Sequence, residues 1–148
     1  LGIYREQIAV RIAQIEFRDY EKPLNADTTF WTSVASAAPR NIRNEVQARN
    51  WLARLHDVPR YFDYQIANMK LGAARGFAPP RATLQGRDRS ITASYEGKTP
   101  DQSPFYEPFK SLPPSLSPEV RAELQDEARK VIAEKVFPAY AKLHAYYT

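Results

Sequence analysis

The sequence predicts a mainly α fold of about five helices in antiparallel packing, connected by a proline-rich strap. Three observations support this prediction. Apolar residues recur at intervals of three and four in several long segments, as they do on one face of an α-helix. Residues that can cap a helix precede two of these segments. Proline is concentrated between Gly97 and Pro118, where neither a regular helix nor a central strand can form.

The first expected helix covers residues 3–20. Its apolar residues recur at helical spacing with charged residues between them, which is an amphipathic pattern; they are Tyr4, Ile8, Ile12 and Ile15. Lys22 and Pro23 end this helix, because the residue before a proline is pushed out of the helical region. The following segment, near 24–38, is rich in threonine and aromatic residues. It fits either one short β-hairpin or an extended loop.

Two further helices are expected at 44–57 and 59–75. Asn44 can cap the first of them, with Gln47 completing a capping box, and Pro59 can occupy the first turn of the second. We expect the pair to form an antiparallel hairpin across a very short turn. Gly76 can end the second helix in the left-handed conformation that glycine adopts readily.

The rest of the chain predicts a helix near 80–95, the strap at 97–117 and a long helix over 118–147. Phenylalanine and tyrosine side chains within the strap indicate that it is pinned to the domain surface. Ser117 and Pro118 form a strong start for the last helix. Pro138 must interrupt this helix, because it has no N–H to donate to the carbonyl four residues earlier.

Length and composition fit one folded domain, or a fragment of a larger helical protein, since the chain has 148 residues of which 43% are hydrophobic. The net charge of +4 is mild, with its excess in the middle of the chain, whereas nucleic-acid binders usually concentrate positive charge on one face far more strongly. No apolar run approaches the ~20 residues of a membrane-spanning helix. The absence of cysteine excludes disulfides and thiolate catalysis. Leu1 is not an initiator methionine, so the sequence fits both a cytoplasmic location and export after signal removal. It does not indicate an oligomeric state.

No catalytic constellation stands out, and no cofactor is expected in this chain. The HExxH pattern, the Gly-rich phosphate loops and the GxSxG elbow are all missing. The two histidines, His56 and His144, have no recognisable ligand spacing. His56 fits a histidine near a helix end, and His144 fits a surface or half-buried position. Glu123 and Glu127 share a helix face, but without a histidine partner they indicate a solvated charged surface more strongly than a metal site.

Arg75 and Arg81 form the one basic group worth weighing as a site. They stand on either side of a corner rich in glycine and proline, where they could hold an anion such as a carboxylate. The same pattern fits Arg75 as a cap for its helix and Arg81 as the partner of an acidic residue elsewhere, and this second interpretation is favoured. Neither arginine is expected to bind a metal.

The order of several segments resembles the bacterial domain-of-unknown-function family 885. In that family a helix ending in Arg-Leu is followed by a proline-started helix, a glycine-rich corner and a Pro-Arg pair. Here these correspond to Arg54-Leu55, Pro59, Gly72 with Gly76, and Pro80-Arg81. The strap and the Phe-Pro-Ala-Tyr break at 137–140 also fit the family, so the resemblance covers nearly the whole chain.

Members of that family are much longer helical proteins that look like zincin-type metallopeptidases, with an HExxH helix downstream of the matched part. The resemblance therefore implies a non-catalytic, upstream helical portion that shapes or covers a cleft. Zinc would be bound elsewhere in the full-length parent, and the remainder of the same polypeptide would be the partner. The alternative is a self-contained helical module for protein interaction or anion binding.

Overall fold

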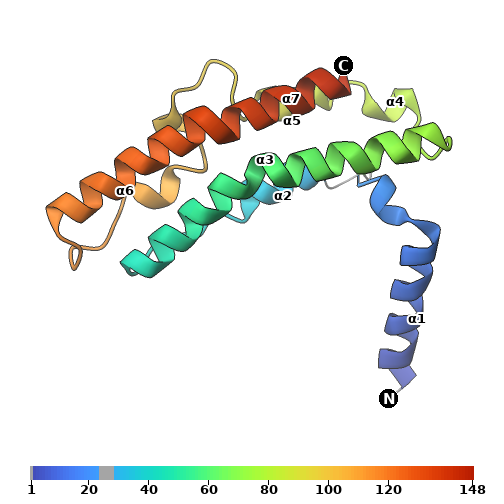
Figure 1. Cartoon of the computed structure of the whole chain (residues 1–148), viewed down its shortest axis with the longest axis horizontal. Coiled ribbons are helices and arrows are strands. Elements are labelled where there is room, and N and C mark those ends of the chain that lie inside the picture. The colour runs from blue at the N-terminus through green and yellow to red at the C-terminus, as the bar shows by residue number, and fades with distance from the viewer. Residues whose placement is uncertain (1, 24–28) are drawn as a thin grey trace.

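The computed structural model describes residues 2–23 and 29–148, apart from the side chain of Arg81. The described residues form helices and connecting segments without any β-strand, so the mainly α prediction is confirmed. The chain builds an elongated body from two long helical rods that lie side by side, with shorter helices packed around them (Figure 1).

Helix α3 (Glu45–Ala74) is the first rod, and its 30 residues make it the longest element described. Asn44 caps it as predicted, with its side-chain oxygen accepting from the Gln47 N–H at 2.9 Å. The predicted hairpin between 57 and 59 is wrong, because α3 continues straight through Pro59. A proline inside a helix removes one backbone hydrogen bond and its ring crowds the carbonyl four residues earlier, at a cost of about 3 kcal/mol. The buried face extends on both sides of Pro59, from Ala48 to Gly72, and this packing outweighs that loss.

The second rod consists of α6 (Pro118–Val131), a π-helical turn η4 (Ile132–Val136) and α7 (Phe137–Tyr147). Ser117 caps α6 as predicted, accepting from the N–H of Val120. The interruption expected at Pro138 takes the form of this π-helical turn, which ends just before the proline. A π-helical turn is a common way for a helix to accommodate a break in its regular hydrogen bonding.

Two predicted segments, near 24–38 and at 80–95, form short helices that differ from the sequence predictions. Residues 30–36 form helix α2 (Phe30–Ser36), so the hairpin near 24–38 is wrong there, while 24–28 lie outside the described residues. The expected helix at 80–95 is split into α4 (Arg81–Leu84) and α5 (Asp88–Thr92). Gly86 lies between them with a φ of +80°, a conformation that ends a helix.

The strap at 97–117 follows its prediction and holds only two short 3-10 turns, η2 (Pro100–Gln102) and η3 (Glu107–Phe109). Two side chains of the strap, Phe105 and Phe109, are completely buried in the core. The indole N–H of Trp51 on α3 donates to the Phe105 carbonyl at 3.0 Å, which ties the strap to the first rod.

The core lies between the two rods and is rich in aromatic rings. Tyr140 on α7 packs against Phe62 on α3, with ring centroids 4.8 Å apart. Its hydroxyl donates to the carbonyl of Trp31 on α2 at 2.7 Å. Burial raises the pKa of Tyr140, so the hydroxyl remains protonated and keeps its role as donor. One side chain thus joins both rods and α2.

The N-terminal helix α1 (Gly2–Phe17) projects away from this body (Figure 1). It is followed by the 3-10 turn η1 (Asp19–Glu21), so the helix expected at 3–20 ends earlier than predicted, at Phe17. Arg18 has a left-handed backbone with φ of +61°, which turns the chain between the two elements. No residue of α1 is buried.

We expect Tyr140→Phe to lower the free energy of unfolding by about 1–3 kcal/mol, because the buried Trp31 carbonyl loses its donor. Chemical denaturation followed by circular dichroism measures this loss. Tyr64→Phe is the matched control, since Tyr64 is 60% exposed on the outer side of α3. Equal stability of the two variants would contradict the role assigned to the Tyr140 hydroxyl.

Candidate functional site

The corner after α3 brings one of the two predicted arginines into contact with the N-terminal part of the chain. Arg75 is the C-cap residue that follows α3, and its Nε donates to Glu21 while its Nη2 donates to the Phe17 carbonyl at 2.9 Å. The Glu21 side chain is 2% exposed, whereas that of Arg75 is 38% exposed. The guanidinium thus covers a buried carboxylate and ties η1 to the end of α3.

Two aromatic rings complete the surroundings of Arg75. Its guanidinium carbon lies 4.5 Å from the ring centroid of Phe77 and 5.9 Å from that of Phe17. These two rings also meet each other edge to face at 5.2 Å. Lys22 lies 4.4 Å from the centroid of Phe77 as well. The Arg75 guanidinium therefore interacts with the Glu21 carboxylate and with two aromatic rings at the same time.

Gly72 allows this close contact. A Cβ atom placed on Gly72 would lie 2.5 Å from the Glu21 carbonyl oxygen and 2.9 Å from that of Phe77. Both obstacles are backbone atoms, so they cannot move aside as a flexible side chain would. The Phe77 N–H donates to the Gly72 carbonyl at 2.8 Å, which closes the corner. The glycine is thus required for packing.

Arg81, the other predicted residue, begins α4, and its side chain lies outside the described part of the structure. An anion at the corner would have to compete with Glu21 for the guanidinium of Arg75. Anion binding by Arg75 and Arg81 stays a prediction.

The two histidines have different neighbours. His56 lies within α3 and not at a helix end, and its Nε2 is 3.5 Å from Glu127 on α6. His144 is half-buried on α7, with Nδ1 3.2 Å from the Tyr95 hydroxyl. Glu123, which the sequence places beside Glu127, instead pairs with Arg49 at 3.2 Å. The two carboxylates thus join α6 to α3.

Zinc, which the family resemblance associates with the parent protein, does not fit the residues described. No group of three or more histidine, aspartate and glutamate side chains in residues 2–23 and 29–148 is close enough together to hold a metal ion. Likewise, no helix in this part of the chain is both long and apolar enough to cross a membrane.

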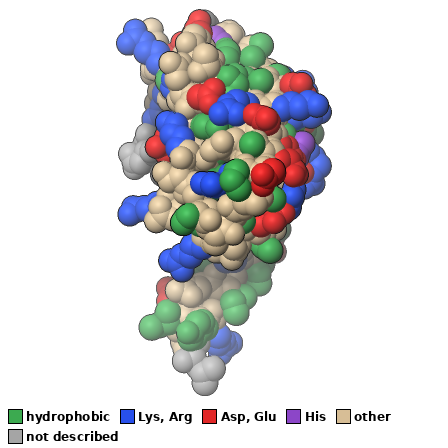
Figure 2. All heavy atoms as spheres, turned by 90° about the vertical axis from the view of Figure 1, so that its left-hand side faces the viewer, with side chains coloured by type: hydrophobic (Ala, Val, Ile, Leu, Met, Phe, Trp, Pro, Cys, Tyr) green, Lys and Arg blue, Asp and Glu red, His purple; other side chains and the backbone are tan. Residues whose placement is uncertain are grey.

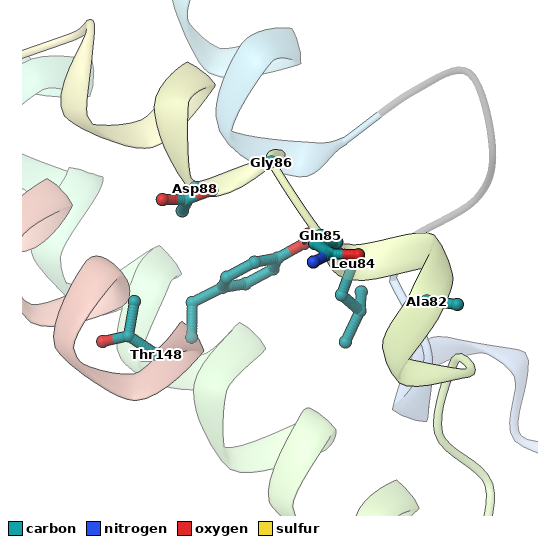
Figure 3. Close-up of a pocket in the computed structure, with 7 residues that line it drawn as sticks. Ala82, Leu84, Gln85, Gly86, Asp88 and Thr148 are labelled. Carbon is teal, nitrogen blue, oxygen red and sulfur yellow. Dashed lines mark hydrogen bonds between the residues drawn. The ribbon is translucent and has the colours of Figure 1, made fainter.

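A hollow of about 520 Å³ opens between α4, the start of α5 and the end of α7 (Figure 3). Asp88 and Thr148 lie on one side of it, and Leu84 and Gln85 lie on the other. The Tyr147 hydroxyl donates across it to the Leu84 carbonyl at 3.1 Å. Burial raises the pKa of Tyr147, which favours this protonated donor. The hollow offers one carboxylate, that of Asp88, among its lining residues.

The most unusual surface belongs to α1. Its large apolar side chains are exposed around the helix, with Ile3 72%, Ile15 67% and Ile8 59% exposed. Figure 2 shows hydrophobic side chains gathered on the projecting part of the molecule, below the mixed polar surface of the body. The predicted helix is present, but its apolar residues lie on opposite faces and not on one, because Ile3, Val10 and Phe17 are exposed as well. None of them is part of the described core.

The arrangement of the helices is shared with a segment of a much longer protein. A crystal structure described as the "putative lipoprotein from Colwellia psychrerythraea" has a TM-score of 0.68 and 22% sequence identity to this chain. The likeness covers 78% of this chain and 20% of that one, so this chain spans about a fifth of the solved protein. No curated protein sequence matches the chain.

The family is shown by sequence. The profile of the family described as "Bacterial protein of unknown function (DUF885)" matches residues 2–148, and the chain belongs to this family. This confirms the family that the corner, the strap and the Phe-Pro-Ala-Tyr break indicate.

We expect Gly72→Ala to destabilise the protein by about 1–3 kcal/mol, because the new methyl group would overlap the Glu21 carbonyl oxygen. Thermal unfolding measures the loss, and hydrogen exchange would show faster exchange in η1. Gly2→Ala is the control, since a Cβ there meets nothing within 4 Å. Unchanged exchange in η1 would show that Gly72 does not hold that turn in place.

Proposed function

We propose that this chain forms a non-catalytic helical portion of a larger zinc metallopeptidase-like protein, in which it shapes or covers a cleft. The observation that carries the proposal is the exposed apolar surface of α1. The first step of the argument is that this helix packs against a further part of the protein. The second is that the larger protein has the character that the family resemblance implies.

The energetics of α1 support the first step. Most of the stability of a helix in a protein comes from packing its apolar face, and isolated helices shorter than about 12–15 residues are marginal in water, a length that α1 barely exceeds. α1 has 16 residues, and none of them is buried. Exposed apolar patches on soluble proteins commonly mark surfaces of interaction. A covering partner would provide the burial that α1 lacks.

The comparisons bear on both steps. The fold likeness covers only 20% of the matched solved chain, as expected if this chain is one portion of a larger protein, which supports the first step. Membership of the family agrees with the resemblance from which the peptidase character is inferred. The partner we propose for α1 is the remainder of the same polypeptide, and the zinc ligands would lie in that remainder.

The self-contained module remains the alternative. A closed polar surface would favour it, whereas α1 presents an apolar one. In its anion-binding form, the Arg75 guanidinium would have to exchange Glu21 for the ligand.

We expect the double variant Ile8→Glu, Ile12→Glu to reduce binding of a hydrophobic dye and any self-association of the chain. The free energy of unfolding should change by less than about 0.5 kcal/mol, because the two side chains are exposed. Dye fluorescence, analytical ultracentrifugation and denaturation measure these effects. Leu71→Glu is the control, since Leu71 is a single apolar residue, 58% exposed, on α3. A wild-type chain that is monomeric and binds no dye would argue against the proposal that the apolar surface of α1 packs against a further part of the protein.

We also expect the purified chain to contain far less than one zinc ion per molecule and to cleave no peptide, because its described residues form no ligand cluster. Atomic emission after dialysis measures the metal content. One zinc ion retained per chain would overturn the non-catalytic assignment.

A further inference from the structure

A groove runs along α3 on the side that faces α2. Eight α3 residues line it, among them Leu55 and Asp57. The other six are spaced so that they share one face over four turns: Gln47, Asn50, Trp51, Arg54, Val58 and Tyr61. The opposite wall comes from α2 and the segment that joins α2 to α3. This groove is separate from the Arg75 corner and from the projecting helix.

The groove has an apolar half and a polar half. The apolar half is a hollow of about 260 Å³ that includes Val34, Leu55 and Tyr61. The polar half is a hollow of about 370 Å³ that includes Asn41 and Arg43. Together they reach the size of a small-molecule or peptide site, for which about 300–1,000 Å³ is typical.

Arg54 lies where the two halves meet. Three residues line both hollows: Ala37, Trp51 and Arg54. Arg54 is the charged member of this set, so a group bound to its guanidinium would lie directly beside the apolar hollow. An occupant must therefore carry an anionic group and an apolar group next to each other.

The positive charge of the groove is not neutralised by the acidic residues nearest to it in the chain. Neither Arg43 nor Arg54 has an ion pair with any described side chain. Glu45 pairs with Arg49 at 2.8 Å, on another face of α3. Asp57 at the rim of the apolar hollow accepts two hydrogen bonds from Arg60, at 2.6 and 2.7 Å. These bonds lower the pKa of Asp57 and offset its charge.

We propose that this groove binds the C-terminal end of a peptide whose last residue is apolar. The terminal carboxylate lies between Arg43 and Arg54, and the last side chain enters the hollow formed by Leu55, Val58 and Tyr61. Asn41 and Asn50 offer amide groups to the peptide backbone that precedes it.

A chain terminus fits this arrangement better than an acidic side chain within a peptide. A terminal residue carries its carboxylate and its side chain on the same carbon atom, which matches the direct contact of the two halves at Arg54. Arginine is also suited to the planar carboxylate, because its guanidinium can donate two parallel hydrogen bonds. The binding requires no metal, so it stands independently of the peptidase character proposed above.

Fluorescence anisotropy with two labelled peptides tests the proposal. One is fluorescein-Gly-Ser-Ala-Phe with a free carboxylate, and the other is the same peptide with a C-terminal amide. We expect the acid to bind at least about tenfold more tightly than the amide, because only the acid forms charged hydrogen bonds with arginine. Arg54→Gln should weaken binding of the acid by about the same factor and abolish its advantage over the amide.

Two further variants control for general effects. Lys130→Gln removes the same charge from an exposed position on α6, away from the groove, and should leave binding unchanged. Ala37→Glu places a carboxylate at the junction of the two hollows and should abolish binding of the acid, while circular dichroism reports whether the fold is kept. Equal binding of acid and amide, or an Arg54→Gln variant that binds like the wild type, would overturn the proposal. So would a wild-type dimer that Ala37→Glu dissociates without any peptide binding, since the groove would then be an interface between two copies.

Discussion

The packing of α3 against the rod formed by α6, η4 and α7 is the interaction on which the rest of the structure depends. The two rods run side by side over most of the body (Figure 1). Their contact surface holds Phe62 and Tyr140, and the Tyr140 hydroxyl extends the contact to α2 through the Trp31 carbonyl. The strap lies on the same core through Phe105. Each short element is thus placed by its contacts with the two rods or with the aromatic rings between them.

The same packing explains where local sequence rules succeed and where they fail. The capping residues Asn44 and Ser117 act within one turn, so the sequence alone places both helix starts correctly. Pro59 shows the opposite case: its local preference is to begin a helix, but the buried stripe on both sides keeps α3 continuous. Residues 30–36 look extended from their composition, yet the burial of Phe30 and Trp31 against the core stabilises a helix there.

The candidate sites also divide into features set by nearby residues in the sequence and features set by packing in the folded body. Arg75 is recognisable in the sequence as a helix-end residue, but its partner Glu21 is 54 residues away and no spacing rule connects them. The helical spacing of the apolar residues of α1 is recognisable in the sequence, whereas only the folded body shows that they contact no part of the described core. The α3 groove is different, because its lining residues from Gln47 to Tyr61 form a regular stripe that a helical projection reveals. What the projection does not show is that α2 leaves this stripe partly open.

The length of α3 sets the distance between the α3 groove and the point where α1 leaves the body. With a rise of about 1.5 Å per residue, its 30 residues span about 45 Å. The groove occupies the N-terminal half of this rod. The backbone of η1 packs against Gly72 near the other end. The point where α1 leaves the body therefore has a defined position relative to the groove. The buried contact between Glu21 and Arg75 keeps η1 at that end of the rod. A partner that covers α1 would therefore be placed relative to the groove by one continuous helix, which is the geometry that the proposed role in shaping a cleft requires.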